Sequence, residues 1–188
     1  MSSESQAQVG NIDPLPLTVK EEPTEASTTA SQKLTGDIGS EEKPWHAAFP
    51  KPSVEADYLP SEQVLEELKD EEKKKGVLLV DLRRNDHDGK TIGDALNLPA
   101  QSLYTSIPTV VDLAIAANKP KIIYYCGQSL GRGSRAAAWT KEYIEKKGLG
   151  DKVSSFALEG GIKGWVKNAD EKPDFKAFLG ETDKAEGW

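Results

Sequence analysis

The chain contains a single cysteine, Cys126, and an arginine, Arg132, stands six places after it. Together these two residue types suit chemistry on an oxyanion, because a thiolate is a strong nucleophile and a guanidinium offers a planar fork of donors to two oxygens. The loop between them includes Gly127 and Gly131, and a third glycine, Gly133, follows the arginine. Glycines let a backbone turn tightly and approach a ligand closely. The spacing Cys-x5-Arg therefore predicts an anion-binding loop that carries a sulfur nucleophile.

The segments on either side of this loop can position both side chains. A run of β-forming residues, Ile122 to Tyr125, comes directly before Cys126, and an alanine-rich helical pattern follows Arg135. A strand that ends at the cysteine holds the sulfur at the carboxyl edge of a sheet. A short loop that runs into a helix turns several backbone N–H groups toward one point, where an oxyanion can bind. The same N–H groups and the positive end of the helix favour the thiolate form of a cysteine.

Three other interpretations of this stretch are open. A lone cysteine at a strand end often serves as a small buried apolar residue. A glycine-rich turn between strand and helix can bind a nucleotide, but this one lacks both the Gly-Lys-Ser/Thr ending of a P-loop and the GxGxxG pattern. Arg132 and Arg135 could be ordinary surface charges, although cations oppose the helix dipole at that end unless an anion binds there. The combination of cysteine, loop and arginine favours the nucleophile.

Length and charge limit the classes of function. The 188 residues suit one domain with a tail, and the formal net charge of -7 without an evident basic patch argues against general binding to nucleic acid or to an acidic membrane. A single cysteine cannot form an internal disulfide and suits a reducing compartment. If the cysteine were oxidised during turnover, an external thiol would have to restore it.

No signal peptide and no apolar run of membrane-spanning length is evident in the sequence. We therefore expect an intracellular protein, cytoplasmic or nuclear or both, that has no membrane partner. The sequence leaves its oligomeric state open.

The chain divides into three parts by composition. Residues 1–43 are polar and acidic and contain no aromatic side chain, so they are predicted to be disordered. Residues 44–170 carry the strand and helix patterns of one domain. Residues 171–188 either pack on that domain or trail away from it.

Strands and helices are expected to alternate through the central part. We expect an edge strand at Tyr58 and Leu59, a helix with Ser61 as its N-cap, and a helix that begins at Ser106 or Ile107 with Pro108 in its first turn. The remaining expected elements are a buried strand at 77–80, a brief strand before Pro99, strands at 122–125 and 153–157, a helix that ends at Gly148, and a turn with a short helix at 158–165. This order predicts an α/β three-layer domain with a mainly parallel central sheet of about five strands.

Asp81 follows the strand at 77–80, at the same predicted sheet edge as Cys126. It could take part in catalysis, but an acidic residue at this place more often ties down a neighbouring loop through backbone hydrogen bonds, and we favour that supporting role. Asp86 and His87 lie in the polar loop that follows and have no partner that the sequence identifies.

Four motifs, in this order, resemble the rhodanese domain superfamily over about residues 56–168. The motifs are Val80-Asp81-Leu82-Arg83, the segment from Gly93 to Pro99, the Cys126 loop, and the segment from Leu158 to Trp165. The resemblance implies the rhodanese-like fold, in agreement with the element order.

The length of the Cys126 loop is similar to one branch of that superfamily. Sulfurtransferase rhodaneses typically have a shorter loop, whereas the phosphatases that activate cyclin-dependent kinases and the related fungal arsenate reductases have Cys-x5-Arg followed by Gly-x-Arg/Lys, as at 126–135 here. Carried over to this sequence, the resemblance makes Cys126 the nucleophile and Arg132 the oxyanion-binding residue, with Arg135 as a possible support. The loop residues that would bind the substrate are Gly127, Gln128, Ser129, Leu130, Gly131 and Arg132.

Two positions differ from that branch. Tyr125 stands where a histidine is common before the cysteine, and the loop carries no acidic residue, so a leaving-group acid is unassigned.

These observations predict a cysteine-dependent enzyme that acts on an oxyanion, as a phosphatase or as an arsenate reductase. We expect no bound cofactor and no metal, and the reductase would use glutathione or glutaredoxin as its external thiol. Two alternatives are a thiosulfate-type sulfurtransferase that carries a persulfide on Cys126, and a non-catalytic module that binds an anionic partner through the loop.

Overall fold

The computed structural model describes residues 43–87 and 89–182, all of which belong to a compact unit at Glu42–Trp188. The disorder predicted for residues 1–43 concerns residues outside this part of the chain, except for Lys43.

A five-stranded parallel sheet forms the centre of the unit, in the strand order β1-β6-β5-β2-β4. Chain order crosses this spatial order several times, as parallel strands joined by helical crossovers require. The strands are β1 (Asp57–Leu59), β2 (Val77–Asp81), β4 (Leu96–Asn97), β5 (Lys121–Tyr125) and β6 (Ser154–Leu158). The prediction of a mainly parallel sheet of about five strands is confirmed.

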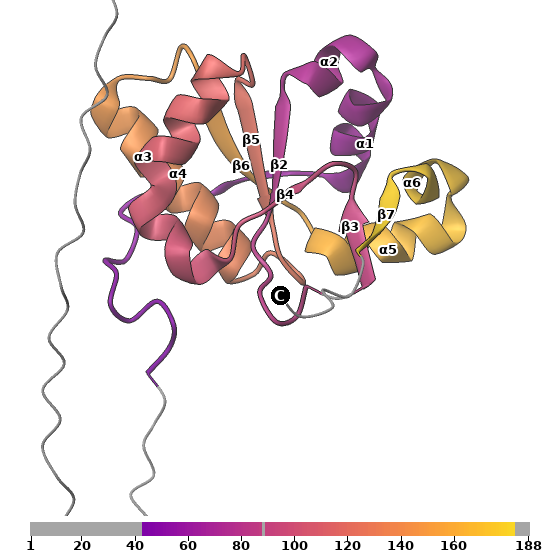
Figure 1. Cartoon of the computed structure of the whole chain (residues 1–188), viewed down its shortest axis with the longest axis horizontal. Coiled ribbons are helices and arrows are strands. Elements are labelled where there is room, and N and C mark those ends of the chain that lie inside the picture. Colours follow the sequence, from indigo (N-terminus) through magenta and orange to yellow (C-terminus); the bar gives the residue numbers. More distant parts are fainter. Residues whose placement is uncertain (1–42, 88, 183–188) are drawn as a thin grey trace, which may run out of the picture. The chain divides into compact units, whose positions relative to one another are not determined.

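Helices cover both faces of this sheet (Figure 1). On one side lie α3 (Ala100–Ala116) and α4 (Arg132–Lys147), and on the other lie α1 (Ser61–Lys69), α2 (Glu71–Lys75), α5 (Gly161–Glu171) and α6 (Pro173–Ala177). Alternate side chains of β5 enter two separate cores, Ile122 and Tyr124 toward α3 and α4, and Ile123 and Tyr125 toward α1 and α5. The central strand is thus apolar on both faces, as its continuous run of β-formers indicates.

Helix α3 begins six residues earlier than expected, at Ala100, with Pro108 inside the helix. The expectation of a start at Ser106 or Ile107 is therefore wrong. Pro108 lacks the N–H that would bond to the fourth preceding carbonyl, at a typical cost of ~3 kcal/mol. Burial outweighs this cost, since each large apolar side chain removed from water contributes about 1.5–3 kcal/mol and Leu103, Ile107 and Val111 are all buried.

Ser61 does not cap its helix. It is the first residue of α1 after Pro60, no side chain caps this end, and the Ser61 hydroxyl instead donates to the carbonyl of Glu159 at 3.2 Å. The side-chain cap in this region belongs to Asp70, which accepts from two backbone N–H groups of α2. The charged run that follows this cap, Glu71–Lys75, forms a short helix of its own.

The segment after residue 170 packs on the domain as far as Thr182, where the described residues end. Phe175 of α6 is buried, and the Trp165 indole donates to its carbonyl at 3.1 Å. Strand β7 (Leu179–Thr182) pairs antiparallel with β3 (Gly89–Ile92) in a second, two-stranded sheet. The sequence patterns did not predict β3.

Among the helices of the described residues, none combines the length and the apolar character needed to cross a membrane.

Candidate active site

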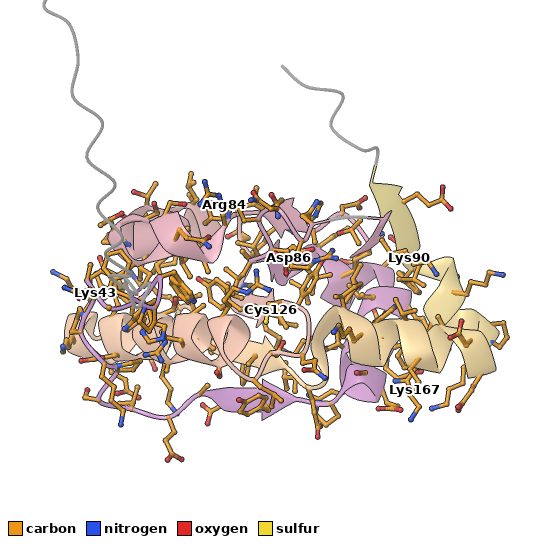
Figure 2. The ribbon with its side chains drawn as sticks, turned by 90° about the horizontal axis from the view of Figure 1, so that it is seen from below. Lys43, Arg84, Asp86, Lys90, Cys126 and Lys167 are labelled. Carbon is orange, nitrogen blue, oxygen red and sulfur yellow. The ribbon has the colours of Figure 1, made fainter. Side chains whose placement is uncertain are left out.

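Cys126 lies at the carboxyl edge of the central sheet, directly after β5. Only 5% of the residue is exposed, and the backbone N–H of Ser129 lies 3.3 Å from its sulfur in donor geometry. Figure 2 looks onto this edge from below the view of Figure 1, and shows Cys126 near the middle of the face with Asp86 close by. The sulfur therefore belongs to a nearly buried residue, and a hydrogen-bond donor of its own loop is directed at it.

The first two carbonyls of the loop are held by α5. The carbonyl of Cys126 accepts from the N–H of Ile162, and that of Gly127 accepts from the N–H of Lys163, each at 3.0 Å. Gly161 makes this close approach possible, because a Cβ there would lie 2.4 Å from the Cys126 oxygen, and its φ of +57° also disfavours other residues. The start of α5 thus fixes the backbone that carries Cys126.

Backbone amides of the loop remain available to a ligand. None of the described residues accepts a hydrogen bond from the N–H groups of Gly127, Gln128, Leu130 or Gly131. These donors precede α4, whose first residue is Arg132. Unpaired N–H groups at the start of a helix are the backbone arrangement that binds an oxyanion.

Ser129 closes the underside of the loop. It has a φ of +57°, which is uncommon for a residue other than glycine, and its buried hydroxyl finds no partner among the described residues. Its side chain points toward Gly133, where an added Cβ would lie 2.9 Å from the Ser129 hydroxyl oxygen. Gly133 is therefore required by packing, and Ser129 supplies its backbone to the loop while its side chain lies outside the cleft.

The guanidinium of Arg132 is engaged by a carboxylate from another part of the chain. Its Nη1 donates to Oδ1 of Asp86 at 2.8 Å, and its Nη2 donates to Oδ2 of the same side chain. This pairing raises the pKa of Arg132 and holds the pKa of Asp86 well below its usual value. The Cys126 sulfur also contributes to the raised pKa of Arg132.

A second, buried pair shapes the loop that carries Asp86. The Asp81 carboxylate accepts from the backbone N–H of Arg83 and from its side chain, with Arg83 Nη2 at 2.6 Å from Oδ2, while His87 Nε2 lies 3.4 Å from the same oxygen. Arg83 also donates to the carbonyl of Lys90 at 2.6 Å. Asp81 thus ties down the loop after β2, which is the supporting role favoured from sequence.

Tyr125, which precedes the cysteine, points away from the cleft into the core under α1 and α5. Its hydroxyl lies 2.9 Å from the Thr91 hydroxyl and accepts from the backbone N–H of Ile92 at 3.2 Å. Burial, followed by the negative charge of Asp81, raises the pKa of this phenol. Tyr125 therefore anchors β3 beside the site and remains a neutral hydrogen-bonding group.

Cys126 and Arg132 open into a cleft of about 920 Å³. Of the predicted substrate-binding residues, Gly127, Gln128, Leu130 and Gly131 also line it. Residues that the sequence did not bring into the site complete the walls: Trp45, Arg83, Asp86, Gly89, Lys90, Ile162, Lys163 and Val166. Positive side chains outnumber negative ones around this cleft, although the whole chain has a formal net charge of -7.

Arg135 lies outside this cleft. Its guanidinium stacks over the Trp139 ring at 5.8 Å from the centroid, and its Nη2 lies 3.4 Å from Nε2 of His46. The structure thus brings Cys126 and Arg132 to one place and puts Arg135 against the segment before β1.

Within residues 43–87 and 89–182, no group of three or more His, Cys, Asp or Glu side chains is arranged to hold a metal ion.

Comparisons with known proteins give consistent results. A family model described as a rhodanese-like domain matches residues 64–168. Arsenical-resistance protein 2 of Saccharomyces cerevisiae is 28% identical over 107 residues, which are 54% of this chain and 82% of that protein.

Two solved structures share the fold. The As-Sb reductase of Leishmania major superposes with a TM-score of 0.58 at 21% identity, over 67% of this chain and 92% of that one. A yeast protein tyrosine phosphatase of the rhodanese family superposes with a TM-score of 0.52 at 18% identity, over 63% of this chain and 89% of that one.

Proposed function

This chain belongs to the rhodanese-like domain family, and from that premise we propose that it is a cysteine-dependent oxyanion enzyme that reduces arsenate with an external thiol. The observation that carries the proposal is the Cys126 loop, in which a sulfur, unpaired backbone amides and the Arg132 fork face one cleft. The likeness to an arsenical-resistance protein and to an As-Sb reductase supports arsenate as the substrate.

In the first step, the Cys126 thiolate attacks the arsenic atom and forms a sulfur–arsenic bond. An arsenate hydroxyl takes up a proton from solvent and leaves as water. The loop amides and Arg132 stabilise the negative charge on the remaining oxygens, as donors aimed at a developing oxyanion do. For an oxyanion to bind Arg132 end-on through both terminal nitrogens, Asp86 has to leave the guanidinium, since it bonds to both of them in that way.

In the second step, an external thiol attacks the Cys126 sulfur. The electron pair of the sulfur–arsenic bond stays on arsenic, which is thereby reduced from As(V) to As(III) and released as arsenite. Cys126 is left in a mixed disulfide with the external thiol, and a second thiol molecule restores it by exchange. Because the chain has one cysteine, both reducing thiols come from outside. A small thiol such as glutathione, or a thiol protein such as a glutaredoxin, fits this requirement.

Phosphatase activity is the second candidate. The likeness to the yeast tyrosine phosphatase and the length of the loop favour it. In that reaction Cys126 displaces the alcohol from phosphorus, and water then hydrolyses the cysteinyl phosphate. The acid that would protonate the departing alcohol is missing from the loop, so we expect activity to be confined to good leaving groups such as aryl phosphates.

The test compares wild type with Cys126→Ser in three assays. The first supplies arsenate with glutathione and glutaredoxin, the second an aryl phosphate, and the third thiosulfate with cyanide. We expect wild type to release arsenite and Cys126→Ser to release none above the rate without enzyme. Turnover of thiosulfate alone would point to a sulfurtransferase. A wild-type protein that releases no arsenite overturns the proposal, and release of phosphate alone would favour the second candidate.

A further inference from the structure

The guanidinium of Arg132 is paired with a carboxylate of the same chain. Both terminal nitrogens of its guanidinium bond to the two oxygens of Asp86, a residue 46 positions earlier in the sequence. Two parallel N–H···O bonds to two oxygens are also the geometry with which a guanidinium binds phosphate or a similar oxyanion. An oxyanion that binds end-on through the two terminal nitrogens therefore needs the donors that the Asp86 carboxylate uses.

The loop after β2 presents this carboxylate in a defined position. Oδ1 of Asp86 accepts from the backbone N–H of Arg84 at 3.1 Å. In the same turn, the backbone N–H of His87 donates to the Arg84 carbonyl at 3.1 Å. The buried Asp81–Arg83 pair holds the start of the loop. Asp86 therefore reaches Arg132 from a hydrogen-bonded turn.

The pair is nevertheless open to replacement. Half of the Asp86 side chain is exposed, and it lines the same cleft as Cys126. A rotation of this side chain toward solvent would free the guanidinium without moving the sheet. Because Arg132 keeps the pKa of Asp86 low, the carboxylate is ionised near neutral pH and has no proton to donate to a leaving group while it is paired.

We propose that Asp86 sets the anion affinity of the Cys126 site, because its carboxylate competes with every incoming oxyanion for the guanidinium of Arg132. This inference deepens the function proposed above and rests on it for the kind of anion that the site takes. When a binding-competent state is only a fraction of the population, the apparent dissociation constant rises by the inverse of that fraction. The paired state therefore raises the apparent dissociation constant of every anion by one common factor, so that weakly binding anions do not occupy the site.

Two anions of different charge distinguish competition for Arg132 from simple electrostatic repulsion by Asp86, because only competition changes both affinities by the same factor. If Asp86 acted only through its negative charge, its removal would improve the binding of a doubly charged anion more than that of a singly charged one, since Coulomb energy scales with charge. If it competes for Arg132, both anions gain by the same ratio. Sulfate and nitrate are suitable probes, because one is a dianion, the other is a monoanion, and neither is a substrate of the proposed reaction.

The experiment measures dissociation constants of sulfate and nitrate by titration calorimetry, on the full chain in a low-chloride buffer. Asp86→Asn keeps an oxygen for the Arg84 N–H and removes the charge, whereas Asp86→Ala removes both. Asp94→Asn is the matched control, since Asp94 is exposed and forms no ion pair among the described residues. Thermal unfolding verifies that each variant is folded.

We expect both Asp86 variants to bind sulfate and nitrate about tenfold more tightly than wild type, with the sulfate-to-nitrate ratio unchanged and Asp94→Asn equal to wild type. A gain for sulfate that clearly exceeds the gain for nitrate, unchanged affinities, or no anion binding by any protein each overturns the inference. The readout needs no turnover. A protein that behaves as expected here but releases no arsenite contradicts the proposed function alone.

Discussion

Two arginine–carboxylate pairs involve the loop after β2, and they differ in burial more than in chemistry. The side chains of Asp81 and Arg83 are 0% and 6% exposed, whereas those of Asp86 and Arg132 are 50% and 22% exposed. Removing one partner of a buried pair leaves a charge without water or counter-charge, while an exposed pair can open into solvent at little cost. The same two functional groups thus make a fixed support in one place and a replaceable contact in the other.

The pairs also differ in what they connect. Asp81 and Arg83 are two residues apart, so their pair gives one loop its shape. Asp86 and Arg132 join that loop to the loop of Cys126, across 46 positions of sequence. The first pair is therefore expected to matter for folding and the second for binding, and four variants test this division.

Asp81→Ala should have the largest effect on stability. It leaves the Arg83 guanidinium buried without its partner, and breaking a buried pair in this way typically costs about 3–5 kcal/mol. Urea unfolding at neutral pH measures the loss, with Asp94→Ala as an exposed control that should change stability by less than ~0.5 kcal/mol. If Asp81→Ala were no more harmful than this control, the distinction between the two pairs would be wrong.

Arg132→Lys should act on the reaction and hardly at all on stability. A lysine keeps the charge but loses the planar fork, and removal of one donor to a developing oxyanion typically lowers kcat by about 10²- to 10³-fold. Arsenite release under saturating thiol measures the effect. Arg135→Lys is the matched control, because Arg135 lies outside the cleft, and an equal loss in the two variants would contradict the proposed role of Arg132.

Tyr125→Phe probes the surroundings of the buried pair. It leaves the buried N–H of Ile92 without its acceptor, and such a loss typically costs about 1–3 kcal/mol. The wild-type phenol also has a raised pKa in the folded state, so the unfolded chain releases this proton at lower pH than the folded one. Stability should accordingly fall as pH rises above about 10, with Tyr125 contributing up to about 1.4 kcal/mol per pH unit.

Denaturation at several pH values between 9 and 11 measures this contribution. The alkaline slope should be smaller in Tyr125→Phe than in wild type. Equal slopes in the two proteins would mean that the phenol does not keep its proton in the folded state.

Asp86→Asn should have only a small effect on stability, below about 1 kcal/mol at neutral pH, because the pair is largely exposed. The folded-state pKa of Asp86 is lower than its unfolded value, so its contribution is present above about pH 4 and is lost as pH falls through the folded-state pKa. Unfolding curves of wild type and Asp86→Asn should therefore converge in acid. A difference that widened in acid would contradict the assigned pairing.

The sequence predicted the parts of the site that depend on local spacing. The distance from Cys126 to Arg132 and the apolar run before the cysteine identify a strand, a loop and a helix start without tertiary information. Asp86 could be recognised only as a polar loop residue, because its partner is 46 positions away and nothing in its neighbours marks that contact. The positions of Lys163 and Trp45 in the cleft likewise depend on how distant segments pack.

The errors in the fold have a similar origin. Local rules place Pro108 at a helix start and Ser61 at a cap, but burial of the α3 face and a hydrogen bond to Glu159 decide otherwise. Strand β3 has little apolar character and forms only because β7, some ninety positions later, pairs with it. Local propensity is a weak guide wherever a tertiary contact supplies more free energy.

The hydrogen bonds from α5 to the Cys126 loop have a consequence for protein engineering. A designer who transplants residues 126–132 into another parallel α/β scaffold would move the cysteine, the loop amides and Arg132 but leave behind the groups that orient them. The carbonyls of Cys126 and Gly127 need the N–H groups of Ile162 and Lys163, and that approach needs Gly161. The smallest transferable unit is therefore two separate stretches of chain, and a graft that lacks the second should lose the shape of the first.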